Sequence, residues 1–289
     1  MSHPVPQSIL RRRPDTSKGD YGHVLVIGGA IGMTGAPVMA AQAALRAGAG
    51  LVTLGVPETV YFIVASKLTE VMTHPLPATP KGTLSTSALP ILQPLILKAD
   101  CLALGPGLSR DPVTAHAVQQ IVAQADLPIV LDADGVNAFS GGTARRKIAR
   151  AKGPMVLTPH PGEMARLFGV SIDVVQKNRT GVAKKAAKEL KAVVVLKGHR
   201  TVVAHPVGKL YVNRTGNPGM ATAGTGDLLT GIIAALIGQG CDPFEAAAAG
   251  VYLHGLAGDI AAKKVGETSL IAGDLLAAIP DAFLRVSKH

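Results

Sequence analysis

The sequence lacks tryptophan, and its other aromatic residues and its charged residues are few. Aromatic side chains make up 3% of the 289 residues and charged ones 17%, whereas hydrophobic residues make up 47%. So little charge beside so many apolar residues excludes an intrinsically disordered chain. With few aromatics, the core must be built from Ala, Val, Leu and Ile. The 33 glycines predict many tight turns and close backbone approaches.

Long apolar runs are also missing. A segment that crosses a bilayer needs roughly 18 consecutive apolar residues. Residues 228–237 are apolar but too short, and residues 244–262 are interrupted by Glu245, His254 and Asp259. The sequence therefore predicts no membrane-spanning helix.

The chain has little cysteine and no recognisable export signal. Its N-terminus lacks the apolar run of a signal peptide, and Arg11-Arg12 is followed by polar residues, not by the hydrophobic region of a twin-arginine signal. The two cysteines, Cys101 and Cys241, suit a reducing compartment and need not pair. We therefore expect a cytoplasmic protein.

The charge that is present is mostly positive. The formal net charge is +10, and the basic residues are scattered apart from the clusters Arg11-Arg12-Arg13 and Lys184-Lys185. A positive excess can attract nucleic acid or an anionic surface. It equally suits an enzyme that handles phosphorylated small molecules. Because few aromatics are available to stack on bases, we favour the second interpretation and expect neither nucleic acid nor membrane as a partner.

Short apolar runs alternate with segments of helical periodicity. The runs predict strands at residues 23–27, 51–56, 99–104, 128–131, 155–157 and 193–196, with a hairpin at 201–204 and 210–212. Helices are predicted at residues 35–47, 113–125, 174–190, 227–237 and 243–262. Continuous apolar strands are typical of a parallel sheet buried on both faces. No repeat or linker divides the chain, so we predict an α/β fold with an N-terminal arm over residues 1–17 and one domain over residues 18–289.

Glycine and polar residues follow these predicted strands. They are Gly28-Gly29, Gly105-Pro106-Gly107, Asp132-Ala133-Asp134, residues 158–163 and Lys197-Gly198. Ligands of open α/β sheets bind beyond the carboxyl ends of the strands. We therefore expect these segments to converge on one ligand-binding rim.

The strongest candidate is the Gly- and Thr-rich segment that leads into the apolar helix at residues 227–237. Backbone N–H groups of Gly224, Thr225 and Gly226 could cradle an anion, and the helix N-terminus adds positive potential. Asp227, at the helix start, could accept a proton from an attacking hydroxyl. The alternative for Asp227 is an ordinary helix cap.

Other strand ends carry residues with two interpretations each. His160, between two prolines, could bind a ligand or be structural. Glu163 could hold a Mg²⁺-bound water or be a carboxylate at a helix start. Asp132 and Asp134 could bind a ligand hydroxyl or belong to a turn. Residues 197–201 could grip phosphate or form a hairpin turn.

Two familiar nucleotide motifs are missing. Residues 28–32 do not fit G-x-G-x-x-G, and no acidic residue ends the next predicted strand, 51–56, which leads into Pro57-Glu58. A redox dinucleotide site is therefore disfavoured. There is no Walker A sequence, and no His/Cys cluster has metal-ligand spacing.

Taken together, the motifs resemble the ADP/ATP-dependent NAD(P)H-hydrate dehydratases of the ribokinase-like superfamily. The resemblance runs from about Lys18 to the C-terminus, through segments 18–23, 28–36, 104–107, 131–134, 157–163, 195–198 and 223–227. Ala-Gly-Thr-Gly-Asp at 223–227 alone would indicate only the superfamily. Its combination with Thr-Pro-His-Pro-Gly-Glu at 158–163 and Lys-Gly-Asp-Tyr-Gly-His at 18–23 is far more specific. The implied fold is a three-layer α/β/α arrangement.

The resemblance implies repair of hydrated NADH and NADPH (NADHX and NADPHX) by ADP-dependent dehydration, with Mg²⁺ as cofactor. Asp227 would activate the 6-hydroxyl of the ring, and Gly224, Thr225 and Gly226 would stabilise the transferred phosphoryl group. The positions that match hydrate-binding ones are Ala36, Gly107, His160 and Asp227. Those that match nucleotide-binding ones are Lys197, Gly198, His199, Arg200, Thr201 and Gly226. By the same resemblance we expect a homotetramer and an epimerase on a separate chain.

Two alternatives to this activity remain, and the choice of phosphoryl donor is also open. A kinase of the same superfamily, acting on a hydroxymethylpyrimidine, thiazole or sugar, would share Asp227 and the glycine-rich anion hole. ATP could replace ADP as the phosphoryl donor. A non-catalytic nucleotide-binding sensor would keep its ligand-dependent function when Asp227 is replaced by asparagine.

Overall fold

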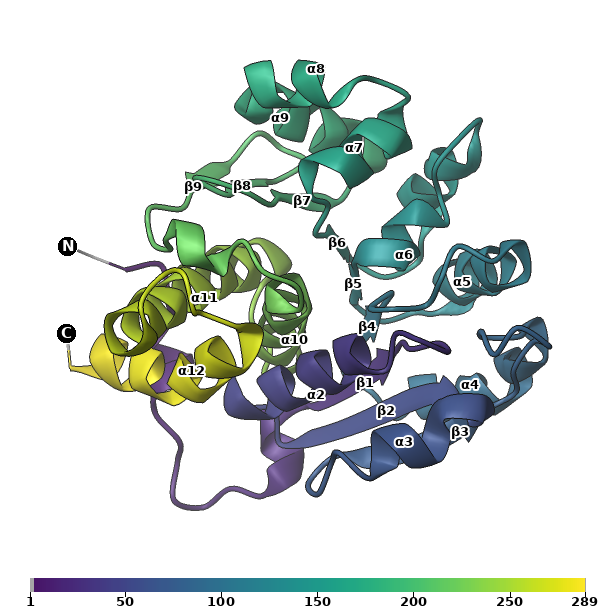
Figure 1. Ribbon diagram of the computed structural model, residues 1–289, viewed down its shortest axis with the longest axis horizontal. Coiled ribbons are helices and arrows are strands. Elements are labelled where there is room, and N and C mark those ends of the chain that lie inside the picture. Colours follow the sequence, from purple (N-terminus) through teal and green to yellow (C-terminus); the bar gives the residue numbers. More distant parts are fainter. Residues whose placement is uncertain (1–2, 289) are drawn as a thin grey trace.

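One open sheet of nine strands forms the centre of the protein, in the order β3-β2-β1-β4-β5-β6-β7-β8-β9 (Figure 1). The computed structural model describes residues 3–288, so residues 1, 2 and 289 of the predicted arm and domain lie outside it. The strands are β1 (His23–Ile27), β2 (Leu51–Pro57), β3 (Met72–Leu76), β4 (Cys101–Leu104), β5 (Ile129–Leu131), β6 (Met155–Leu157), β7 (Val193–Leu196), β8 (Val202–Ala204) and β9 (Leu210–Val212). Neighbours from β3 to β7 are parallel, and β7, β8 and β9 are antiparallel. The predicted mainly parallel sheet and its hairpin are both confirmed.

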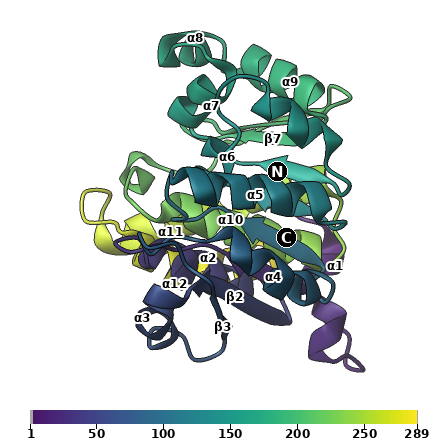
Figure 2. The ribbon, with the colours of Figure 1, turned by 90° about the vertical axis from the view of Figure 1, so that its right-hand side faces the viewer.

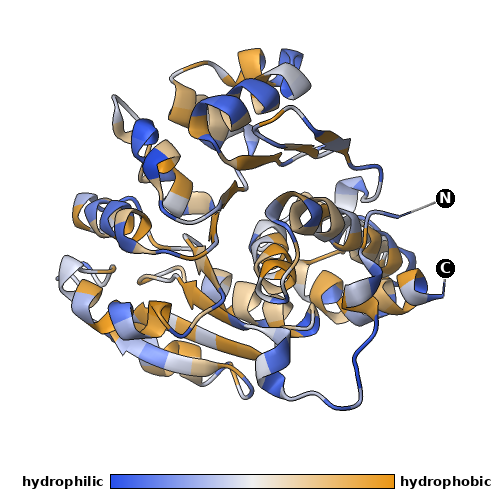
Figure 3. Ribbon diagram, turned by 180° about the vertical axis from the view of Figure 1, so that it is seen from behind, coloured by the Kyte–Doolittle hydropathy of each residue, from blue (hydrophilic) through white to orange (hydrophobic). Residues whose placement is uncertain are grey.

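Helices cover both faces of the sheet because the strands are apolar on both faces. Along β1, Val24 and Val26 join one hydrophobic cluster, whereas Leu25 and Ile27 join another. The first cluster includes residues of α2 (Gly35–Arg46), α10 (Thr225–Gly238), α11 (Pro243–Val265) and α12 (Ala272–Ser287). The second includes residues of α4 (Leu89–Ile96), α5 (Pro112–Gln124) and α6 (Ala133–Asn137). Figure 1 shows the two helical layers on opposite sides of the strands, and Figure 3 shows the hydrophobic strands between them. This is a three-layer α/β/α architecture.

A further group of helices packs at the β7–β8 end of the sheet. It consists of α7 (Pro161–Phe168), α8 (Ile172–Lys177) and α9 (Arg179–Leu190), which lie together in Figure 2. The remaining α-helices are the short α1 (Gln7–Leu10) and α3 (Tyr61–Ala65). Short 3₁₀ helices occur at Lys18–Tyr21, Glu58–Val60, Thr86–Ala88, Ala144–Arg150 and Pro218–Met220.

Local signals explain where several helices begin. Asp111 precedes Pro112 at the start of α5, and its carboxylate accepts the N–H of Val113 at 2.9 Å. Asp242 caps α11 in the same way before Pro243. An N-cap carboxylate satisfies a free backbone N–H, and proline at the first helical position loses no hydrogen bond there.

The structure corrects two predicted helices. The single helix expected over residues 174–190 is divided into α8 and α9 at Asn178, whose backbone leaves the helical region with φ −143°. The side chain of Asn178 accepts the N–H of Gly181 at 2.9 Å and so caps the second helix. Helix α10 begins at Thr225, so Asp227 is its third residue and Gly224 is the cap.

The N-terminal segment packs against the domain. Val5 is only 4% exposed and belongs to the same hydrophobic cluster as Val286 of α12. The guanidinium of Arg12 lies 3.9 Å from the ring centre of Tyr21 and donates to the carbonyl of Gly48 at 2.7 Å. Among the helices over residues 3–288, none has the length and apolar character needed to cross a membrane.

Candidate active site

A glycine-dependent turn leads the chain into α10. Gly224 has φ +90°, and a Cβ there would lie 2.6 Å from the sulfur of Met39. The Thr225 hydroxyl donates to the carbonyls of Met220 and Thr222, each at 3.0 Å, which fixes the turn. The first N–H groups of the helix have no intrahelical acceptor and carry the positive end of the helix dipole. The geometry thus suits an anion at residues 224–226.

Asp227 lies in the first turn of this helix and is partly buried. Burial raises the pKa of its carboxyl to about 7, and the nearby charge of Asp132 adds to the rise, while Lys197 opposes it. A carboxyl with such a pKa can accept a proton near neutral pH and release it again. Asp227 therefore has the protonation behaviour of a general base.

Asp132, at the end of β5, connects several elements of the site through hydrogen bonds. Its carboxylate is 1% exposed and accepts three charged or hydroxyl donors. They are Lys197 Nζ at 2.6 Å, Thr158 Oγ1 at 2.7 Å and Thr230 Oγ1 at 2.7 Å. Because Thr230 belongs to α10, Asp132 ties that helix to the ends of β5, β6 and β7. Its fully bonded geometry indicates a structural and electrostatic role.

Lys197 follows β7, and its ammonium lies among carboxylates. It is 3.9 Å from Glu163 Oε2 in addition to its bond to Asp132. Burial by itself lowers the pKa of this ammonium, but Asp132 and Glu163 more than compensate, so the net pKa is raised. A Cβ at Gly226 would lie 3.3 Å from Lys197 Nζ, so the cation lies next to the turn of residues 224–226.

His160 and Glu163 form a reciprocal cap at the start of α7. His160 Nδ1 accepts the N–H of Gly162 at 2.9 Å, and Glu163 Oε2 accepts the N–H of His160 at 2.7 Å. A neutral imidazole with Nδ1 as acceptor carries its proton on Nε2. Burial raises the pKa of Glu163 to about 7. Burial, together with Lys197 and Arg166, lowers the pKa of His160.

The other residues expected at the rim form two groups, one around Gly107 and one in the turn after β7. A Cβ at Gly107 would lie 3.3 Å from Ala36 Cβ and 2.8 Å from the Met33 carbonyl, so Gly107 and Ala36 are adjacent. Gly198, His199, Arg200 and Thr201 form the turn between β7 and β8, in which Thr201 Oγ1 donates to the Gly198 carbonyl at 3.0 Å. Within residues 3–288, no hydrogen bond joins His199 or Arg200 to Asp227.

Sequence reasoning missed several residues that shape the site. His254 of α11 bonds the Thr225 carbonyl at 2.8 Å through Nε2, and burial lowers its pKa to about 4, so it is a neutral donor. Asp259 accepts the N–H of Gly216 at 3.0 Å and an amide hydrogen of Asn217 at 3.0 Å, which anchors the loop before the anion-binding turn. The only local signal was that both interrupt an apolar helix.

The donor set fits a Mg²⁺ ion carried by a nucleotide better than a resident metal. Within the described chain, no three His, Cys, Asp or Glu side chains form a metal-binding group. Asp132 is already neutralised by Lys197. Glu163 and Asp227 remain, and Mg²⁺ sites in phosphoryl-transfer proteins commonly use one or two carboxylates with phosphate oxygens and waters.

The fold and this site together define a ribokinase-like protein. A ribokinase-like superfamily protein of Enterococcus faecalis matches the structure with a TM-score of 0.80 and 29% identity, covering 98% of this chain and 95% of that one. The predicted fold class is therefore confirmed.

Within this class, the sequence matches the NAD(P)H-hydrate dehydratase family over residues 24–281, and the chain belongs to that family. It is 54% identical to the bifunctional NAD(P)H-hydrate repair enzyme of Moorella thermoacetica over 93% of its own length. It covers only 51% of that relative, so it spans about half the length of the bifunctional protein.

Two further relatives match over nearly their whole length. The ADP-dependent (S)-NAD(P)H-hydrate dehydratase of Neisseria meningitidis is 39% identical over 98% of this chain and 92% of its own. The ADP/ATP-dependent NAD(P)H-hydrate dehydratase of Bacillus subtilis, co-crystallised with ATP and Mg²⁺, has a TM-score of 0.80 and 32% identity over 96% of this chain and 94% of that one.

Proposed function

We propose that this protein uses ADP to dehydrate the S-epimer of NADHX and NADPHX, giving NADH or NADPH with AMP and phosphate, and so repairs damaged nicotinamide nucleotides. The observation that carries the proposal is the buried Asp227 carboxyl, with a pKa of about 7, next to the anion-binding turn of residues 224–226. The match to the Neisseria relative over nearly its whole length supports the substrate and the donor.

The first step is phosphoryl transfer. Asp227 accepts the proton of the 6-hydroxyl on the hydrated ring, and the freed oxygen attacks the terminal phosphorus of ADP. The bond between that phosphorus and the bridging oxygen breaks, and AMP leaves with the bridging oxygen. Backbone N–H groups of Gly224, Thr225 and Gly226 stabilise the charge on the transferred group. Mg²⁺, when bound with the nucleotide, would neutralise phosphate charge.

The second step is elimination. The bond between ring carbon 6 and the phosphate oxygen breaks, and a proton leaves carbon 5, which restores the ring double bond. Phosphate is a better leaving group than hydroxide, so the phosphoryl group makes the loss of water feasible. The buried Lys197 ammonium, under Gly226, stabilises the negative charge of this cluster throughout.

We assign ligand contacts from the same arrangement. The adjacent Ala36 and Gly107, with His160, would bind the hydrated ring beside Asp227. The nucleotide would lie against the turn after β7, where the proposed contacts are Lys197, Gly198, His199, Arg200, Thr201 and Gly226. Glu163 would reach Mg²⁺ through a water. A tetramer and a separate epimerase stay predictions.

The test incubates hydrated NADH with the protein, Mg²⁺ and either ADP or ATP, and follows recovery of the absorbance of the reduced nicotinamide. We expect recovery with ADP, and Asp227→Asn should lower kcat by about 10²–10⁴-fold while nucleotide binding is retained. The exposed Asp126→Asn is the matched control and should leave kcat unchanged.

Other results would redirect or reject the proposal. A stable phosphorylated product without recovered NADH would support a small-molecule kinase. Faster recovery with ATP than with ADP would change the donor. No recovery with either nucleotide would reject the proposed dehydratase activity.

A further inference from the structure

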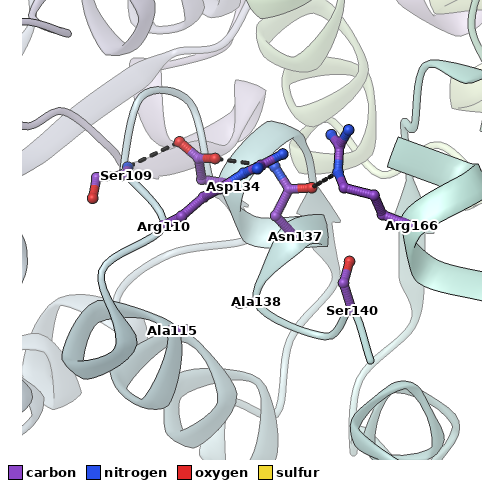
Figure 4. Close-up of a pocket in the computed structure, with 8 residues that line it drawn as sticks. All are labelled: Ser109, Arg110, Ala115, Asp134, Asn137, Ala138, Ser140 and Arg166. Atoms are coloured by element: carbon purple, nitrogen blue, oxygen red, sulfur yellow. Dashed lines mark hydrogen bonds between the residues drawn. The ribbon is translucent and has the colours of Figure 1, made fainter. Parts of the chain in front are cut away.

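A cavity of about 160 Å³ lies beside the proposed hydrate site. Figure 4 shows the side chains around it, which come from the loop after β4, from α5, α6 and α7, and from the segment after α6. The polar residues that line it are Ser109, Arg110, Asp134, Asn137, Ser140 and Arg166. Neither the proposed chemistry nor the nucleotide contacts use these residues.

Hydrogen bonds hold the wall of this cavity in one arrangement. Asp134 accepts the N–H of Ser109 at 2.9 Å and an amide hydrogen of Asn137 at 3.0 Å. Arg166 Nε donates to Asn137 Oδ1 at 3.0 Å, as the dashed line in Figure 4 marks. Both carboxylate oxygens of Asp134 thus accept a hydrogen bond. Together the three bonds connect the loop after β4 to α7.

Some hydrogen-bond donors in the wall of this cavity have no acceptor. Within residues 3–288, no carboxylate lies within 4.0 Å of the guanidinium of Arg110 or Arg166. The bond of Arg166 to Asn137 uses Nε, and its terminal nitrogens form no hydrogen bond with any other residue that the structure describes. The hydroxyl oxygen of Ser140 is buried without a hydrogen-bond partner, which is uncommon in proteins. Two unpaired cations and an unused hydroxyl are suited to an oxyanion.

Residues that line the cavity lie close along the chain to residues proposed to bind the hydrate. Ser109 is two residues after Gly107, and Arg166 lies on α7, the helix that His160 caps. Both arginines are near enough to contribute to the lowered pKa of His160. The ADP phosphates are expected elsewhere, at residues 224–226 and 197–201. The cavity is therefore near the residues proposed for the hydrate and is not lined by those proposed for ADP.

We propose that Arg110 and Arg166 bind a phosphate group of the hydrated dinucleotide in this cavity, with the Ser140 hydroxyl as a third donor. The proposal rests on the dehydratase function proposed above. Both substrates carry a pyrophosphate, and NADPHX carries one further phosphate on its ribose. The arginines thus determine how tightly the remote half of the substrate is bound.

The test compares Arg110→Ala and Arg166→Ala with the unmodified protein at saturating ADP. Each variant should raise the KM for the hydrate by about tenfold, because a charge-assisted hydrogen bond is lost, and should leave kcat nearly unchanged. Arg166→Lys, which keeps the charge but not the forked geometry, should fall between. Arg146→Ala is the matched control, since Arg146 is exposed and does not line the cavity.

Calorimetric binding of NADH and NADPH to the same variants gives a second, activity-independent measurement. An equal loss of affinity for both dinucleotides identifies the pyrophosphate as the bound group, and a loss confined to NADPH identifies the ribose phosphate. Unchanged KM and affinity in both alanine variants, or a rise only in the KM for ADP, would overturn the assignment. An unmodified protein that binds NADPH in an arginine-dependent way without turnover would support the cavity and reject the dehydratase.

Discussion

At the scale of single residues, the Lys197 ammonium, which is bound to Asp132, also acts on the charges of Glu163 and Asp227. Asp227 and Glu163 both have a pKa raised to about 7, in each case mainly by burial, and Lys197 limits both shifts. A fully charged cluster of largely desolvated carboxyls would be costly, whereas a shared proton is tolerated. Under the proposed function, such a site could take up the proton that the hydrate releases.

These pKa shifts predict how stability depends on pH. The ordinary pKa values are 3.8 for Asp227 and 4.5 for Glu163, and the folded values are about 7. Between these limits the folded state binds more protons than the unfolded state, so the free energy of unfolding falls as pH rises from about 4 to about 7. Asp227→Asn should therefore be more stable than the unmodified protein above pH ~7, by at most about 4 kcal/mol.

Urea unfolding at a series of pH values measures this effect. Asp126→Asn changes an exposed carboxyl and should keep the pH dependence of the unmodified protein. An Asp227→Asn variant that is destabilised equally at all pH values would contradict the raised pKa assigned to Asp227.

The sequence predicted some of these residues and not others. Asp227 was recognisable because its glycine-rich approach is local. The partnership of Lys197 with Asp132 was not, because 65 residues separate them and only the order of the strands brings them together. For the same reason Arg110 and Arg166 were not predicted. Nothing in the sequence around either arginine indicates a binding site, and the cavity that both line exists only in the folded chain.

At the scale of elements, α10 packs unusually closely on α2. A Cβ at Gly231 would lie 2.0 Å from the backbone carbonyl oxygen of Ala40. Gly231→Ala should therefore force the helices apart and lower the free energy of unfolding by about 1–3 kcal/mol, although alanine favours helix formation. Urea unfolding measures the change.

The matched control lies in the same helix. A Cβ at Gly238 would meet its nearest atom, Val24 Cγ2, at an ordinary 3.4 Å. Gly238→Ala should be neutral or stabilising by up to about 1 kcal/mol. If both variants were equally stable, the close approach of α2 and α10 would not be a stabilising constraint.

The strands that are buried on both faces were predicted well, whereas the edge strand β3 and the helix α12 were missed. The runs that became β5, β6 and β7 are apolar throughout, and β1 is apolar after His23, so their pattern is unambiguous. Strand β3 was missed because it contains Pro75 and exposes Met72 at the edge of the sheet. Helix α12 was missed as well, and Pro280 interrupts its sequence pattern.

At the scale of the whole molecule, the N-terminal segment packs in the same hydrophobic cluster as the last helix, α12. Val5 is buried in the cluster that includes Val286, so the predicted arm contributes to the core. Val5→Ala should lower the free energy of unfolding by about 1–2 kcal/mol. Thermal and urea unfolding measure the change, and Val207→Ala, at a side chain that is 76% exposed, should change it by less than about 0.5 kcal/mol.

The open sheet leaves two outer strands, and their composition bears on how the protein behaves when concentrated. An outer strand with free backbone groups is a template on which another chain can add a strand and start an aggregate. Pro75 has no N–H to offer at one edge, and β9 at the other is only three residues long. A fold this rich in apolar strands thus limits polymerisation at the places where it would begin.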